Sequence, residues 1–199
     1  MSTFNTEALK KMVSYAIQGA GFNKLLELST YMGIRVYEGE LSLNTTDGTN
    51  YLSVSGKCVA DDMNITVNAE LFSKLIGKIN SDTVDMEVVD NTLVVTGNGK
   101  YTLELVPNEN GDLLAFPDKF PYETSEIGKL SAFDLTVINS AIKASLSTVA
   151  GSVYSSYYFG NIIASTDKAM MSSFNKPVFE TPYLINKEFV DLMCAVRQR

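Results

Sequence analysis

The stretch VNAELFSKLI, residues 67–76, decides the fold, because three more stretches of the chain are built on the same plan. Each begins with an apolar residue, continues with Asn or Ser, and enters a run with apolar residues at helical spacing. Asn and Ser are favoured N-caps because their side-chain oxygen accepts a hydrogen bond from the first helical turn. The cap positions are Asn5, Asn68, Ser131 and Asn186, spaced by 63, 63 and 55 residues. The sequence therefore indicates an internal repeat.

Strand patterns follow the predicted helices, so we expect an α+β fold of repeated helix-plus-antiparallel-strand units with the helices on one face of the sheets. Short alternating runs separated by turn residues, such as Asp47-Gly48, indicate antiparallel hairpins. The helices are expected at 7–17, 69–79, 134–146 and 187–196. The strands are expected at 25–36, 41–45, 51–55, 64–67, 83–89, 93–96, 100–106, 153–164 and 169–174.

A segment rich in Pro, Gly, Asn and Asp, residues 107–122, indicates a connector, with Phe116-Pro117 and Phe120-Pro121 expected to pack against the preceding sheet. We place a domain boundary near Ile127, which gives domains 1–127 and 128–199. The second domain has no strands after its last helix and would leave an open sheet edge, which natural proteins avoid. We therefore expect either a fragment of a longer protein or a chain that borrows this edge from elsewhere.

The composition excludes several classes of protein. The chain of 199 residues contains no histidine and no metal-binding, dinucleotide-binding or phosphate-binding motif, so we expect no metal, no cofactor and no catalytic residue. A net charge of −7 argues against a uniformly basic nucleic-acid binder, although basic residues can still gather on one face. No apolar run approaches the ~18 residues of a membrane helix, and the N-terminus lacks the regions of a signal peptide. We expect a cytoplasmic protein without membrane association, with Cys58 and Cys194 as buried reduced thiols.

The order and spacing of these features resemble the bacterial DNA polymerase III β subunit, the sliding clamp. The resemblance is carried by the strand–helix–strand run of residues 63–106, which includes EVVDNTLVVTG (87–97), and by Phe116-Pro117. The run ASTDKAMM (164–171) is similar to a turn of the family, but Lys168-Ala169-Met170 stands where the family has Gly-His-Arg. This departure suggests a divergent or phage-type version.

The resemblance implies a fold of three similar domains per chain, of which this sequence would cover the first and part of the second. It implies a homodimeric ring whose helices line the hole, although this chain alone should not close such a ring. The implied function is a processivity factor in DNA replication: a non-catalytic subunit of a DNA-directed DNA polymerase that encircles duplex DNA and tethers the polymerase. The implied partners are double-stranded DNA, read without sequence preference, and peptides of the polymerase and the clamp loader.

Two groups of site residues follow. Lysines opposite the apolar helix stripes would meet the phosphate backbone in such a ring, and the resemblance adds a basic loop residue and a tyrosine; the alternative is that these lysines are only solvated. The DNA candidates are Lys10, Lys11, Lys24, Lys74, Lys78, Lys143 and Tyr158. The resemblance also implies a groove for partner peptides, where methionines would suit an adaptable surface; the alternative is an ordinary core. The groove candidates are Phe159, Thr166, Met170 and Met171.

Two other functions compete with the clamp. A clamp-like interaction module would bind replication proteins without encircling DNA. An acidic hydrolase would have Asp61, Asp62, Asp85 and Glu87 as its only candidates, and nothing in the sequence indicates that they face one another as paired-acid chemistry requires.

Overall fold

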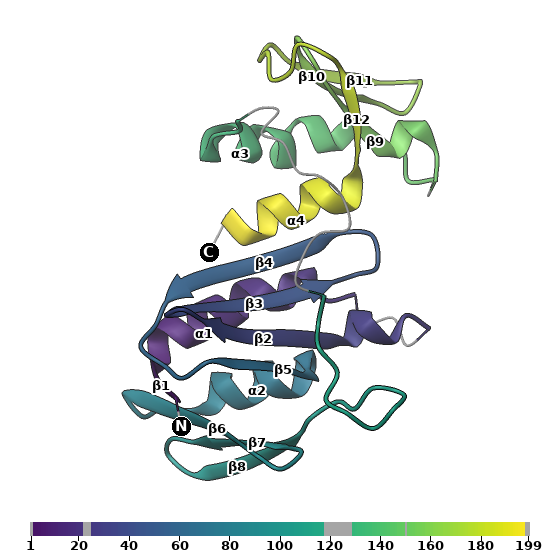
Figure 1. Cartoon of the computed structure of the whole chain (residues 1–199). Coiled ribbons are helices and arrows are strands. Elements are labelled where there is room, and N and C mark those ends of the chain that lie inside the picture. The colour runs from purple at the N-terminus through teal and green to yellow at the C-terminus, as the bar shows by residue number, and fades with distance from the viewer. Residues whose placement is uncertain (1, 22–24, 118–128, 150, 198–199) are drawn as a thin grey trace. The chain divides into compact units, whose positions relative to one another are not determined.

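A computed structural model describes residues 2–21, 25–117, 129–149 and 151–197 (Figure 1). The chain forms two compact units, Met1–Pro121 (unit 1) and Tyr122–Arg199 (unit 2). The boundary expected near Ile127 and the dipeptide Phe120-Pro121 lie outside the described residues. Within them are four α-helices and three four-stranded antiparallel sheets, which confirms the predicted fold class.

Unit 1 contains two copies of one strand–helix–three-strand repeat. The first copy is β1 (Ser2–Asn5), α1 (Thr6–Ala16), β2 (Tyr31–Tyr37), β3 (Glu40–Thr46) and β4 (Tyr51–Lys57). The second copy is β5 (Met63–Asn68), α2 (Ala69–Lys78), β6 (Thr83–Val89), β7 (Thr92–Thr96) and β8 (Lys100–Glu104). The sequence did not predict β1, because four residues are too short to display a strand period.

The two repeats of unit 1 exchange their first strands. The sheet orders are β4-β3-β2-β5 and β1-β6-β7-β8, so β5 joins the sheet of the first repeat and β1 joins that of the second. Phe4 thus pairs with Val84, and Ile34 pairs with Ile65. Side chains of both sheets and both helices form one buried cluster. The repeats therefore share a core and neither is a separate module.

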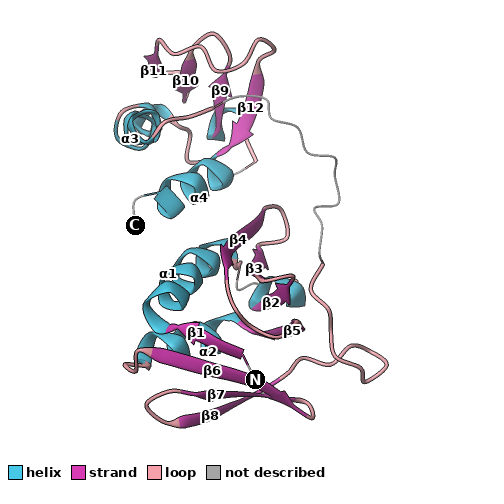
Figure 2. Cartoon of the chain, turned by 60° about the vertical axis from the view of Figure 1, so that its left-hand side comes forward, coloured by secondary structure: helices cyan, strands magenta, loops and turns pink. Residues whose placement is uncertain are grey.

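Both helices of unit 1 pack on the β4-β3-β2-β5 sheet. Helix α1 contacts β3 and β4, and α2 contacts β2 and β5; Figure 2 shows both helices on the same side of this sheet. The inward positions, such as Leu9 and Val13 in α1 and Phe72 and Ile76 in α2, are buried. Their spacing of four residues is the helical period that the sequence displays.

All four predicted N-caps are confirmed. The side chain of Asn5 accepts from the Ala8 N–H at 3.0 Å, and that of Asn68 accepts from the Leu71 N–H at 3.0 Å. Ser131 forms a capping box with Asp134. The Asn186 side chain accepts from the Phe189 N–H at 2.8 Å. The cap is therefore a shared structural feature of the repeat and not only a sequence pattern.

Unit 2 repeats one half of unit 1. Its elements are α3 (Ala132–Ser140), β9 (Ser156–Phe159), β10 (Ile163–Thr166), β11 (Met171–Phe174), β12 (Tyr183–Asn186) and α4 (Lys187–Arg197). The order β11-β10-β9-β12 corresponds strand by strand to β4-β3-β2-β5. The described part of unit 2 has no counterpart of the β1-β6-β7-β8 sheet.

Three expectations about local structure were wrong. Residues 153–164 were expected as one strand, but a 3-10 turn (Val153–Ser155) precedes β9, and a turn closed by the Gly160 N–H and the Ile162 carbonyl separates β9 from β10. The helix expected to reach residue 146 ends at Ser140 and tightens into a 3-10 turn, Ile142–Ser145. The strand expected from residue 25 begins at Tyr31, after the 3-10 turn Glu27–Thr30. In each case apolar residues flank a short tight turn, and periodicity alone does not detect such a turn.

Candidate nucleic-acid interface and binding pocket

The helix lysines of unit 1 differ in whether an acid neutralises them. Lys10 forms an ion pair with Glu7 at 3.4 Å, and Lys74 forms one with Glu70 at 2.5 Å. The hydrogen bond and the charge of Lys74 lower the pKa of Glu70. Both pairs lie within one helical turn and are exposed to solvent, so they stabilise the helices weakly. They also reduce the positive charge that these lysines offer to an anion.

Lys11 and Lys78 remain as the uncompensated cations on these helices. Both are exposed, and neither forms an ion pair with a carboxylate in the described parts of the chain. The Lys11 ammonium group lies 6.0 Å from the centroid of the Tyr15 ring. Helices α1 and α2, which carry these lysines, contact one another within unit 1. Lys24 lies outside the described residues.

In unit 2, Lys143 belongs to a three-residue ion cluster that sequence reasoning missed. The Asp191 carboxylate accepts from Lys143 at 2.7 Å and from Lys187 at 2.8 Å. Partial burial would raise the pKa of Asp191, but hydrogen bonds from the two lysines outweigh it and hold that pKa below its ordinary value. The cluster carries a net charge of +1. The signal for Lys187 was the Lys–Asp spacing of four residues on one predicted helix face.

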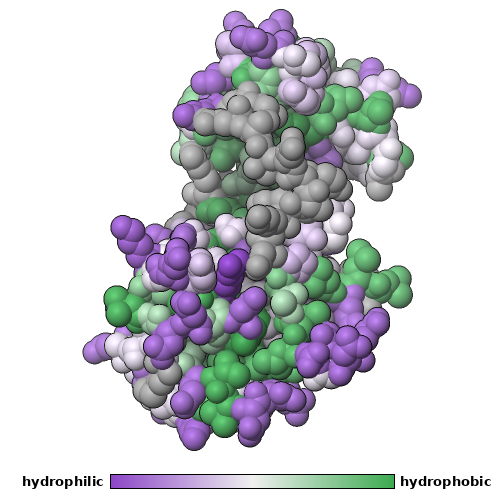
Figure 3. All heavy atoms as spheres, in the orientation of Figure 1, coloured by the Kyte–Doolittle hydropathy of each residue, from purple (hydrophilic) through white to green (hydrophobic). Residues whose placement is uncertain are grey.

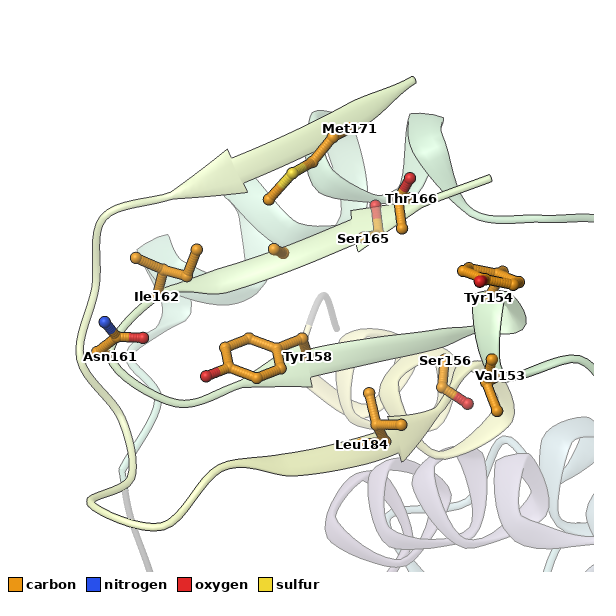
Figure 4. Close-up of a pocket in the computed structure, with 11 residues that line it drawn as sticks. Val153, Tyr154, Ser156, Tyr158, Asn161, Ile162, Ser165, Thr166, Met171 and Leu184 are labelled. Carbon is orange, nitrogen blue, oxygen red and sulfur yellow. The ribbon is translucent and has the colours of Figure 1, made fainter. Parts of the chain in front are cut away.

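The outer face of the unit 2 sheet contains an apolar pocket of about 420 Å³ (Figure 4). Figure 4 shows Tyr158 between Met171 and Leu184, with Tyr154 at one end and Asn161 and Ile162 at the other. The lining residues come from β9, β10, β11, β12 and the turns between them. They are Val153, Tyr154, Ser156, Tyr158, Asn161, Ile162, Ala164, Ser165, Thr166, Met171 and Leu184.

The pocket contains two of the four groove candidates. Thr166 and Met171 line it, whereas Met170 is exposed beside it without lining it. Phe159 is completely buried behind the sheet, with its ring centroid 6.3 Å from that of Tyr157 and 6.1 Å from that of Phe179. Tyr158, a DNA candidate, lines the pocket. Alternation along β9 explains the difference, since Tyr157 and Phe159 point to the core and Tyr158 points away from it.

Sequence reasoning missed Val153, Tyr154 and Leu184 as pocket residues. Leu184 comes into the pocket because it pairs with Tyr158 across β12 and β9, and Ala164 pairs with Tyr158 on the other side. This register depends on the pairing of β12 with β9, two strands that lie apart in the sequence. Tyr154 also makes a cation–π contact, since the Lys168 ammonium group lies 4.8 Å from its ring centroid.

The described residues offer little for catalysis or metal binding. They contain no group of three or more Cys, Asp or Glu side chains that could hold a metal ion. Burial raises the pKa of both thiols, Cys58 and Cys194, which disfavours the reactive thiolate. The Asp85 carboxylate accepts from the Thr3 hydroxyl, and the Asp62 carboxylate accepts from the Glu38 N–H. In the part of the chain that the structure describes, no helix is long and apolar enough to cross a membrane.

The surface of unit 1 is mixed in character. Figure 3 shows apolar atoms among hydrophilic ones over the region of β6 to β8, where Val88, Val89 and Tyr101 are exposed. Within the described residues β8 pairs with β7 and has an open edge on its other side. Exposed apolar side chains beside an open strand edge are typical of contact surfaces.

Comparison with solved structures identifies the fold as that of DNA polymerase III β subunits. The chain superposes on the β subunit from Streptococcus pyogenes with a TM-score of 0.82 at 13% identity, covering 98% of this chain and 55% of that one. The DNA polymerase sliding clamp from Pseudomonas aeruginosa gives 0.74 at 20% identity, covering 99% and 55%. The β subunit from Thermotoga maritima gives 0.76 at 14% identity, covering 98% and 55%. No family model matches the sequence, and no curated protein matches it.

Proposed function

We propose that this chain acts as, or within, a DNA sliding clamp, a processivity factor that holds a replicative DNA polymerase on duplex DNA. The observation that carries the proposal is the pair of interlocked repeats in unit 1, followed by the same half-repeat in unit 2. This arrangement coincides over 98% of the chain with a DNA polymerase III β subunit. The chain spans about 55% of the length of that β subunit. We propose that residues 1–127 form a first clamp domain and that 128–199 form part of a second.

The mechanism is topological and needs no catalytic residue. The helices present lysines to the phosphate backbone, and such contacts carry no sequence information. Lys11 and Lys78 supply unpaired charge, while Lys10, Lys74 and Lys143 share theirs with acids of the same unit. Weak, salt-sensitive contacts of this kind suit a protein that must move along DNA. We place Lys24 with this group by resemblance.

The unit 2 pocket is the proposed site for peptides of the polymerase and the clamp loader. An apolar, partly open pocket with few polar groups is typical of a peptide or small-molecule site. Thr166 and Met171 form its wall, Phe159 supports its floor from the core, and Met170 lies at its edge. We place the protein in the cytoplasm, and we propose that the open edge of β8, which carries the exposed Tyr101, contributes to assembly with a second copy.

The second candidate function is an interaction module that binds replication proteins without encircling DNA. The observation that favours it is that the pocket lies wholly within unit 2 and depends on no lysine of unit 1. The two functions differ in whether DNA is needed.

A primer-extension assay with the polymerase of the source organism tests the proposal. A clamp lengthens the products made per binding event, and Met171→Glu abolishes this gain by placing a charge in the apolar pocket. Lys57→Ala, which removes an exposed charge from β4, serves as the control and retains the gain. If the chain binds the polymerase but leaves product length unchanged, the interaction module is the better account.

A further inference from the structure

The turn after β10 in unit 2 repeats the turn after β3 in unit 1 bond for bond. The Thr46 hydroxyl donates to the Asn50 carbonyl at 2.7 Å, and the Thr166 hydroxyl donates to the Met170 carbonyl at 2.7 Å. The next residue in each turn is an aspartate that accepts from two backbone N–H groups. Positions in the two units can therefore be compared one by one.

Lys168 occupies the position that Gly48 holds in unit 1. The backbone φ angle is +93° at Gly48 and +83° at Lys168. Residues other than glycine rarely adopt this region, because the Cβ atom crowds the backbone. A lysine here keeps a disfavoured backbone conformation, and such positions gather at functional sites.

The side chain of Lys168 fills space that a different residue fills in unit 1. A Cβ atom at Gly48 would lie 2.7 Å from Cδ1 of Leu26, so the end of this leucine side chain occupies that space in unit 1. In unit 2 the Lys168 ammonium group lies 4.8 Å from the ring centroid of Tyr154, which lines the pocket. The contact places a positive charge at one end of an apolar pocket.

This charge has no acidic partner in the described parts of the chain. The neighbouring Asp167 carboxylate accepts from the Ala169 and Met170 N–H groups, and these bonds lower its pKa. The lining residues of the pocket include no carboxylate and no cation, so Lys168 beside Tyr154 supplies the charge. A ligand that enters the pocket therefore meets apolar walls and a single positive charge.

The equivalent sheet face of unit 1 is covered by a segment of the chain itself. Gly33 pairs with Thr66 and Asn44 as Tyr158 pairs with Leu184 and Ala164, so the two positions are equivalent. That place is occupied in unit 1 by the connector, whose Phe116 packs on Gly33. Val106, the residue before the connector, bonds the edge strand, because its N–H donates to the Thr66 carbonyl at 3.2 Å. The segment that contains this phenylalanine, GDLLAFP (111–117), combines apolar residues with one exposed acid, Asp112.

We propose that Lys168 makes the unit 2 pocket selective for an extended apolar peptide that carries an acidic side chain, which pairs with the Lys168 ammonium group at the Tyr154 end. The proposal rests on the proposed role of the pocket as a peptide site. It adds that the partner peptide must carry a negative charge and that Lys168 recognises this charge.

The test uses two fluorescent peptides on the full chain: GDLLAFP, and the same peptide with Asn in place of its Asp. The wild-type chain should bind the acidic peptide about two- to fivefold more tightly at low salt, as expected of an exposed ion pair. Lys168→Gly relieves the backbone and should bind both peptides equally. Lys168→Glu should reverse the preference, and Lys57→Ala should preserve it.

The outcomes separate the inference from the function on which it rests. Equal binding of the two peptides by the wild-type chain, or an unchanged preference in Lys168→Gly, overturns the role of Lys168 and leaves the peptide site standing. If neither peptide binds, or if Met171→Glu binds both as the wild type does, the pocket is not a peptide site and the proposal fails with it.

Discussion

Phe116 packs on Gly33 so closely that a Cβ atom added to the glycine would lie 2.4 Å from the Cβ atom of the phenylalanine. Phe116 is buried, so this contact fixes the end of the connector on the unit 1 sheet. The connector thereby covers a sheet face whose counterpart in unit 2 is the open pocket.

Gly33→Ala should destabilise unit 1, because the new methyl group overlaps the Phe116 side chain near its backbone. We expect a loss of about 1–3 kcal/mol in the free energy of unfolding, the usual effect of overpacking, measured by urea denaturation. Gly77→Ala is the matched control. It lies in α2 with nothing within 4 Å, and it should stabilise the protein by roughly 0.5–1 kcal/mol. A loss in the control equal to that in Gly33→Ala would show that the connector contact is not the cause.

The Asn68 cap should contribute measurably to stability. Asn68→Ala leaves the Leu71 N–H without its 3.0 Å partner and should cost about 1 kcal/mol. Asn68→Asp keeps the acceptor and should cost little. Urea denaturation of both variants measures the difference, and equal stabilities would refute the role of the cap.

These caps, and the α+β class with four helices, could be predicted because they depend on local chemistry. A capping residue, an acid in the first turn and an apolar stripe all lie within a few residues of one another. The pocket could not be predicted in this way. Tyr158, Leu184 and Thr166 lie on three strands, and only their pairing register makes them neighbours.

Features that depend on pairing between repeats could not be predicted from the sequence either. The exchange of β1 and β5 is set by which sheet edge is available, and no local pattern records it. Lys168 was noticed as a departure from a family turn, but its position over Tyr154 follows from backbone geometry that periodicity does not report. Lys10, Lys74 and Lys143 each form an ion pair, so we expect them to contribute less to DNA binding than Lys11 and Lys78.

Some helix lysines are paired with acids and others are not, so two double variants should have opposite effects on DNA affinity. Replacing Lys11 and Lys78 by Gln should weaken binding to duplex DNA and reduce the slope of log K against log salt by about 2, close to 0.9 per lost contact. Replacing Glu7 and Glu70 by Gln should strengthen binding, because Lys10 and Lys74 lose their acidic partners. Fluorescence anisotropy over a salt series measures both variants, with Lys57→Gln on β4 as the control. Identical slopes in all proteins would exclude these helices from the interface.

The ion cluster around Asp191 should stabilise the protein less at acidic pH. The hydrogen bonds from Lys143 and Lys187 hold its folded-state pKa below the unfolded-state value, so its stabilisation is present above about pH 4. This contribution is lost as the pH falls through the folded-state pKa. Asp191→Asn should therefore be less stable than the wild type near pH 7, and the difference should shrink below about pH 4. Thermal unfolding at several pH values checks this, and a difference independent of pH would contradict it.

Retention on circular DNA tests the central claim most directly. The chain, supplied with the clamp-loading machinery of its source and ATP, is incubated with nicked circular DNA and separated from free protein by gel filtration in high salt. The account predicts that the chain, assembled with the further copies or subunits that close the ring, elutes with the circular DNA and is released when a restriction enzyme linearises it, because a ring slides off an open end. Release from circular and linear DNA alike in high salt, or equal retention on both, would contradict a topological clamp.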